Sequence, residues 1–238
     1  MKKIKYINKE IKSIENLEYE NDKMSQNGIN CPKFSAENIR LVHEYVVNQS
    51  SYSTTSGDDF VRRYFQEHRG DVSTASVITK VILIDTVDST NLKQALGKDY
   101  FKLVAERIIR HNLEDIIRVG GRFGDTFKKV AAFPAKAGYV KDDHNLFVFF
   151  SKYITRVNQY SYDRDDYSIM DRVVKDNLKH FHTVDTPIPN VESLRKNYEF
   201  DEYCDIFKPM LEKYPDITRE MIDHFIWFTF KEEAVGDR

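Results

Sequence analysis

An aromatic, apolar segment between residues 144 and 160 constrains the fold of this chain more than any other part of its sequence. Its large apolar residues recur at spacings of three and four, which is the period of an α-helix that buries one broad face. They are Leu146, Phe149, Phe150, Tyr153, Ile154 and Val157. After a polar stretch the same pattern resumes at Ile169 and continues to Leu178, so a second helix is expected there, with Asp171 in its first turns. We therefore predict two consecutive helices, the first of which carries Lys152 among its apolar residues.

Helical periodicity recurs along most of the remaining chain and predicts an all-α protein. Residues that commonly cap helices precede these patterns, and glycines follow several of them. The expected helices are one capped by Ser35, 60–69 closed by Gly70, 73–85, a short one that starts at Asp88-Ser89-Thr90 and ends at Gly97, one from Asp99 through Ile117, one from Val191, one from Tyr203 to Leu211, and one capped by Thr218. The stretch 73–85 suits either a buried helix or a buried strand, because β-branched residues favour strands whereas Ser73 is a plausible helix cap.

The chain is expected to form an N-terminal arm followed by one folded region. Residues 1–33 are rich in Lys, Glu and Asn and finish near Gly28 and Pro32, a composition typical of a weakly structured arm. Residues 34–238 are expected to form a single helical domain, arranged as one bundle or as two helical lobes around a shared cleft. A chain of 238 residues can bury a sizeable core in either arrangement.

Composition places the chain among ordinary globular proteins. Hydrophobic residues make up 41% and charged residues 31%, and the formal net charge of -2 does not by itself indicate a nucleic-acid partner. The two cysteines, Cys31 and Cys204, lie far apart and outside any C-x-x-C motif, which favours a reducing compartment over a disulfide scaffold or a zinc site. No apolar run reaches the roughly 20 residues that a membrane helix needs, and the N-terminus lacks the apolar core of a signal peptide. We therefore expect a cytoplasmic protein with no membrane partner.

Charge is distributed unevenly along the sequence. Residues 100–136 contain eight basic and four acidic residues, whereas residues 199–238 contain five basic and eleven acidic residues. The basic segment includes Gly120, Gly121 and Gly124, and a glycine-rich basic segment can bring backbone amides and side chains close to phosphates. The alternative is a helix end followed by a solvated loop. The candidate nucleic-acid-binding residues are Arg122, Lys128 and Lys129, together with Arg156 on the aromatic helix.

The stretch 144–178 resembles the core of the helix-hairpin-helix DNA glycosylases, most of all the 8-oxoguanine glycosylase branch and uncharacterised bacterial and phage proteins with that fold. The resemblance lies in Ser151-Lys152-Tyr153, in Tyr167-Ser168-Ile169-Met170-Asp171, and in the 19 residues by which Asp171 follows Lys152. In that family a lysine attacks the sugar of a flipped nucleotide, and an aspartate at the start of the next helix assists it as a base or by electrostatic support. The chain departs from the family in two places, because Phe149-Phe150-Ser151 replaces a glycine-rich hairpin and 161–166 replaces a loop rich in glycine and proline.

The resemblance implies a glycosylase-like helical fold and a base-excision glycosylase or lyase that acts on DNA. Lys152 would be the nucleophile and Asp171 its acidic partner, and the reaction would need no metal and no cofactor. The alternative is a non-catalytic helical module that binds nucleic acid or another protein, related to phage or defence functions. Nothing in the sequence indicates an oligomeric state.

Overall fold

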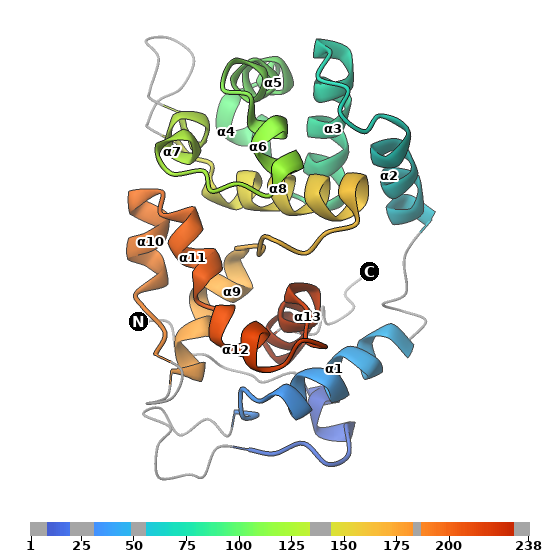
Figure 1. Cartoon of the computed structure of the whole chain (residues 1–238), viewed down its shortest axis with the longest axis vertical. Helices are drawn as coiled ribbons and strands as arrows, with labels where there is room; N and C mark the ends of the chain where they lie inside the picture. Colours follow the sequence, from blue (N-terminus) through green and yellow to red (C-terminus); the bar gives the residue numbers. More distant parts are fainter. Residues whose placement is uncertain (1–8, 20–30, 49–55, 134–143, 183–186, 231–238) are drawn as a thin grey trace. The chain divides into compact units, whose positions relative to one another are not determined.

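The computed structural model describes residues 9–19, 31–48, 56–133, 144–182 and 187–230 (Figure 1). The predicted all-α class is confirmed, because these residues form thirteen α-helices and two short 3-10 helices. β structure in the described ranges is limited to the antiparallel pair of two-residue strands β1 (Ala132–Phe133) and β2 (His144–Asn145), and to one isolated bridge between Tyr19 and Pro32.

The helices divide into two compact units that are discontinuous in sequence. Unit 1 comprises Met1–Ser53, Arg172–Val191 and Ile206–Arg238, and unit 2 comprises Thr54–Asp171 and Glu192–Asp205. Residues 1–8 and 20–30 of the expected N-terminal arm lie outside the described residues. Within the rest of the arm, Lys9–Ser13 forms the 3-10 helix η1, in which Ile11 is buried.

Unit 2 is assembled around α8 (Phe147–Tyr162), drawn in yellow in Figure 1. Eleven of its sixteen residues are buried, so this helix contributes to the core on nearly every side. The helices that pack most extensively against it are α2 (Ser56–Glu67), α3 (Thr74–Val87), α6 (Leu113–Val119) and α7 (Asp125–Ala131). In turn α3 packs along α5 (Tyr100–Arg110), which also contacts the short α4 (Leu92–Leu96).

Aromatic rings join α7 and α8 to α11 (Phe200–Asp205), which follows α10 (Val191–Asn197). The ring of Phe127 stacks on that of Phe200 with centroids 4.6 Å apart and lies 4.7 Å from that of Phe147. All three rings are buried, and aromatic pairs at these distances stabilise a core beyond the area they bury. The cluster fixes α11 against the same helix that carries Lys152.

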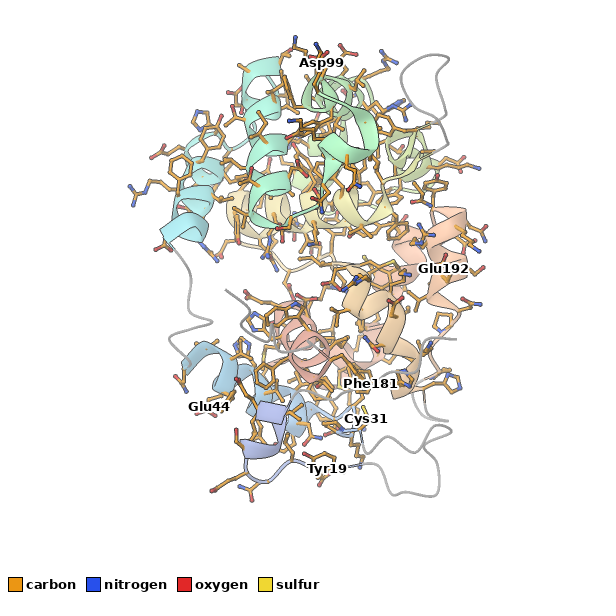
Figure 2. All side chains as sticks on the ribbon, turned by 180° about the vertical axis from the view of Figure 1, so that it is seen from behind. Tyr19, Cys31, Glu44, Asp99, Phe181 and Glu192 are labelled. Atoms are coloured by element: carbon orange, nitrogen blue, oxygen red, sulfur yellow. The ribbon has the colours of Figure 1, made fainter. Side chains whose placement is uncertain are left out.

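Unit 1 is built on α1 (Ala36–Asn48) and α13 (Arg219–Phe230), which pack along each other. It also contains α9 (Arg172–Asn177), the 3-10 helix η2 (Leu178–Phe181) and α12 (Lys208–Lys213). Its core is aromatic, because Phe181, labelled in Figure 2, lies 5.2 Å from Phe34, 5.3 Å from Phe225 and 5.5 Å from Phe230 between ring centroids.

Several predicted helix ends are confirmed. The ambiguous stretch 73–85 is α3, and Ser73 caps it by accepting the N–H of Ser76. Likewise Ser35 accepts the N–H of Asn38 at 3.4 Å at the start of α1, and Thr218 accepts that of Met221 at 3.2 Å at the start of α13. These caps satisfy amides that have no partner within the helix.

Two predicted long helices are wrong because each is interrupted. The expected helix from Asp99 through Ile117 breaks into α5 and α6 at Asn112, whose φ of 50° is left-handed. The expected helix from Tyr203 to Leu211 consists of α11 and α12. Apolar spacing continues across both breaks, so periodicity alone did not reveal them.

Three local predictions also need correction. The segment Asp88-Ser89-Thr90 does not start a helix, because Asp88 is the C-cap of α3 and α4 begins only at Leu92. Asp171 directly precedes α9 rather than lying within its first turns, and Ile169 and Met170 are not helical. The segment after Gly124 is not a loop but the helix α7, whose apolar residues Phe127, Val130 and Ala131 are buried.

Candidate functional site

Lys152 lies on α8 with only 13% of its side chain exposed. Its Nζ donates a 2.9 Å hydrogen bond to the backbone carbonyl of Asp88 and lies 3.7 Å from the Oδ1 atom of that residue. Because Asp88 ends α3, the ammonium sits at the negative end of the α3 dipole. Lys152 is therefore a largely shielded amine that contacts both a carbonyl and a carboxylate.

Asp88 is the carboxylate that sequence reasoning missed at this position. Arg156, one turn after Lys152 on α8, places its Nη2 atom 3.5 Å from the same Oδ1. The side chain of Asp88 is 10% exposed, and its second oxygen, Oδ2, is buried without a hydrogen-bond partner in the described parts of the chain. Such an oxygen is costly to bury and retains its capacity to accept a proton. We call Asp88, Lys152 and Arg156 the Asp88 cluster.

No sequence signal marked Asp88 as a partner of Lys152. The two residues are separated by 64 positions, and the Ser89-Thr90 that follows Asp88 favoured the interpretation of a helix start. Only the packing of α3 against α8 brings them together.

The structure also joins the two segments that carry Lys152 and Asp171. The Oγ of Ser151 accepts the N–H of Met170 at 3.0 Å and lies 3.3 Å from the Met170 carbonyl, to which it can donate. Ser151 is fully buried. Lys152 and Asp171 each directly follow a member of this pair, so the hydrogen bonds bring together the two segments that carry these residues.

The loop before Asp171 is fixed by side chains rather than by glycine and proline. Asn158 donates to Asp166 at 2.8 Å and accepts the N–H of Asp166 at 3.0 Å, while Arg164 pairs with Asp166 at 2.7 Å. Nearer Asp171, the hydroxyl of Tyr203 donates to the carbonyl of Ile169 at 2.5 Å. These contacts restrain the loop before Asp171, although the loop lacks the composition of the glycosylase loop.

The same loop contains Tyr167, whose hydroxyl donates to the carbonyl of Gly121 at 2.8 Å. Burial raises the pKa of Tyr167, and the neighbouring carboxylate of Asp166 acts in the same direction. The hydroxyl therefore stays protonated and keeps its donor role at neutral pH.

The glycine-rich segment does not present its amides to solvent. The N–H groups of Gly120 and Gly121 bond to carbonyls of α6, and the carboxylate of Asp201 accepts the N–H of Gly124 at 2.8 Å and that of Phe123 at 2.9 Å. Gly120 and Gly121 therefore end a helix, as the alternative interpretation expected. The N–H groups of Phe123 and Gly124 already have an acceptor in the carboxylate of Asp201.

The candidate phosphate-binding side chains differ in their surroundings. Arg122 lies 2.8 Å from Asp205, 3.4 Å from Glu202 and 3.8 Å from Asp201, and its hydrogen bond to Asp205 raises its pKa. Lys128 and Lys129 are exposed in the last turn of α7. Three carboxylates thus offset the charge of Arg122, whereas the two lysines extend into solvent.

A buried ionic group lies beside Lys152 on the core side of α8. Lys80 and Glu114 are 0% and 2% exposed, with Nζ–O distances of 2.7 and 3.0 Å, and the hydroxyl of Tyr153 donates to Glu114 at 2.6 Å. Burial, followed by the charge of Glu114, raises the pKa of Tyr153 well above its ordinary value. These contacts join α3, α6 and α8 and fix the rotation of α8 about its axis.

No group of three or more metal-ligating side chains occurs among the residues described. None of the described helices is both long and apolar enough to cross a membrane. Comparisons of the chain with protein-family models, with curated proteins and with solved structures gave no match.

Proposed function

We propose that this protein is a DNA glycosylase or lyase of the helix-hairpin-helix type, with Lys152 as its nucleophile. The observation that carries the proposal is the pair of Lys152 and Asp88, in which a shielded amine lies beside a buried carboxylate that has one unpartnered oxygen. A lysine attacks only as the neutral amine, so it needs a nearby proton acceptor. The resemblance of Ser151-Lys152-Tyr153 and of 167–171 to the glycosylase core adds the substrate class.

The chemistry assigns a separate role to each residue. Asp88 accepts a proton from the ammonium of Lys152, which then releases the Asp88 carbonyl and attacks C1′ of a flipped nucleotide. The new N–C1′ bond replaces the bond to the base, which leaves with a proton, and opening of the sugar ring gives an imine. Asp171, which directly follows the Met170 that is hydrogen-bonded to Ser151, stabilises the positive charge that develops on the sugar.

Borohydride trapping on duplex DNA that contains an abasic site tests this proposal. The amine of Lys152 condenses with the sugar aldehyde and loses water, and borohydride reduces the resulting imine to a stable secondary amine. We expect a covalent adduct with the natural protein and none with Lys152→Gln, whereas Lys93→Gln, an exposed lysine of the same unit, preserves it. Asp88→Asn and Asp171→Asn should each slow trapping by about 10²–10⁴-fold, the usual contribution of a positioned acid or base.

A second function is favoured by one feature of the same cluster. The ammonium of Lys152 already bonds the carbonyl that ends α3, which is the ordinary role of a lysine at a helix C-terminus. If this is its whole role, the chain is a non-catalytic helical module that binds nucleic acid or protein. The natural protein would then form no adduct, and Lys152→Gln would change only stability.

A further inference from the structure

Arg62 of α2 and Arg69, in the turn that follows α2, lie against two tyrosines at the end of α8. The guanidinium carbon of Arg62 lies 4.6 Å from the ring centre of Tyr160, and that of Arg69 lies 6.0 Å from the ring centre of Tyr162. The carbonyl of Phe65, between the two arginines, accepts the hydroxyl of Ser161 at 3.1 Å, so α2 is anchored at this point. Both arginines are nevertheless exposed.

The tyrosines hold these arginines without neutralising them. Among the side chains that the structure describes, no carboxylate pairs with Arg62 or Arg69. By contrast, Arg118 pairs with Asp115, and Arg122 with three acidic residues. Stacking on an aromatic ring restrains the plane of a guanidinium and leaves the N–H groups at its edge available to an acceptor. Arg62 and Arg69 are therefore positioned cations that retain their hydrogen-bonding capacity.

This surface continues into the Asp88 cluster. The ring of Tyr160 that carries Arg62 also lies 5.4 Å from the guanidinium carbon of Arg156, which pairs with Asp88 next to Lys152. Arg62 lies on α2, and Arg69 lies seven residues later in the chain, two residues beyond the end of that helix. Several cations beside an amine nucleophile are suited to binding a polyanion such as a phosphate backbone.

We propose that Arg62 and Arg69, held by Tyr160 and Tyr162, bind the phosphate backbone of the DNA on which the Lys152 site acts. The proposal rests on the function proposed above, and it moves the main phosphate contacts from the α6–α7 segment to α2 and the turn that follows it. Each guanidinium donates to phosphate oxygens and positions the strand without reading its sequence.

The test measures the affinity of the protein for an unmodified duplex oligonucleotide over a range of salt concentrations. For duplex DNA, log K falls with log salt by about 0.9 for each phosphate contact. We expect Arg62→Gln and Arg69→Gln each to lower this slope by about one contact, and the double variant by about two contacts. Arg63→Gln removes the same charge from an exposed neighbour on α2 that stacks on none of the tyrosines that the structure describes. Arg110→Gln removes an exposed positive charge from α5. Both controls should keep the slope of the natural protein.

An unchanged slope in the double variant, with its helical circular dichroism intact, overturns the proposal. It is also overturned if Arg63→Gln lowers the slope as much as Arg62→Gln, because the loss would then reflect the overall positive charge of the surface and not a specific contact. Binding of the duplex by the natural protein with no salt dependence would overturn it as well. Trapping on abasic DNA is measured separately. An adduct together with an unchanged slope rejects this surface but leaves the enzyme, whereas a lowered slope without an adduct supports the surface and rejects the nucleophile.

Discussion

The hydroxyl of Tyr153 donates a 2.6 Å hydrogen bond to the carboxylate of Glu114 inside unit 2, where both side chains are almost completely buried. The same carboxylate forms an ion pair with the ammonium of Lys80. A buried ion pair is stabilised only when its remaining hydrogen-bonding capacity is also satisfied, and Tyr153 supplies that here. Since Tyr153 directly follows Lys152, the group also holds the candidate nucleophile in position.

Replacing Lys80 by Met should destabilise unit 2 by about 3–5 kcal/mol, because it leaves the charge of Glu114 buried without its counter-ion. The triple variant Lys80→Met, Glu114→Leu, Tyr153→Phe removes both charges and the hydroxyl together. Its free energy of unfolding should fall much less than that of the single variant Lys80→Met. Urea unfolding followed by far-ultraviolet circular dichroism measures both. Equal losses in the single and the triple variant would contradict this account of the ion pair.

Tyr153→Phe alone should lower the free energy of unfolding by about 1.5–3 kcal/mol, the usual value for a hydrogen bond to a charged group. The matched control is Tyr64→Phe, which removes a hydroxyl on α2 for which the described residues provide no bond. The control should change stability by less than about 0.5 kcal/mol. The prediction fails if the two variants are equally stable.

Ser151→Ala should loosen the segment before Asp171 specifically. The variant removes the acceptor of the Met170 N–H, and an unsatisfied buried amide costs about 1–3 kcal/mol. We expect hydrogen exchange at the Met170 amide to accelerate by about tenfold or more, since 1.4 kcal/mol corresponds to a factor of ten. Exchange at the Met221 amide, which Thr218 caps in unit 1, should not change. A Met170 amide that exchanges at the original rate would mean that the serine does not hold this segment.

The predictable part of the fold is the part that local chemistry determines. The cap at Ser73 resolved the choice between helix and strand for α3, although its β-branched residues suit both. The break at Asn112 was not predictable, because a left-handed asparagine depends on how α5 and α6 pack rather than on the spacing of apolar residues. Sequence reasoning thus located the helices but merged those separated by a single turn.

The candidate site was predictable only where its residues lie on one helix. Lys152 and Arg156 follow from the pattern of α8, but Asp88 pairs with them through the tertiary contact of α3 with α8. Arg122 is a residue whose surroundings likewise depend on tertiary contacts that the local sequence does not reveal. Its basic segment suggested a phosphate ligand, whereas three acidic residues about 80 positions later in the chain surround it.

Two histidines contact each other where α1 meets α13 in unit 1. The Nδ1 atoms of His43 and His224 lie 3.0 Å apart and their rings are stacked, so a hydrogen bond between them requires one nitrogen to be an unprotonated acceptor. Burial lowers the pKa of His43 below its ordinary value of 6.5, and the charge of Glu220 opposes this only in part. Folding therefore favours the neutral form of His43.

Unit 1 should consequently lose stability in acid through His43. Because the pKa is lower in the folded state, the unfolded chain binds more protons below about pH 6.5. The contribution of neutral His43 is complete above that pH and is lost as the pH falls through the lower pKa of the folded state. Urea unfolding followed by the fluorescence of Trp227, the single tryptophan and a residue of α13, measures this between pH 7.5 and 5. The glutamine of His43→Gln cannot titrate, so the stability of this variant should fall less steeply with decreasing pH than that of the natural protein. An equally steep fall would assign the acid sensitivity to other groups. His180 would be the first of these to test, because burial lowers its pKa as well.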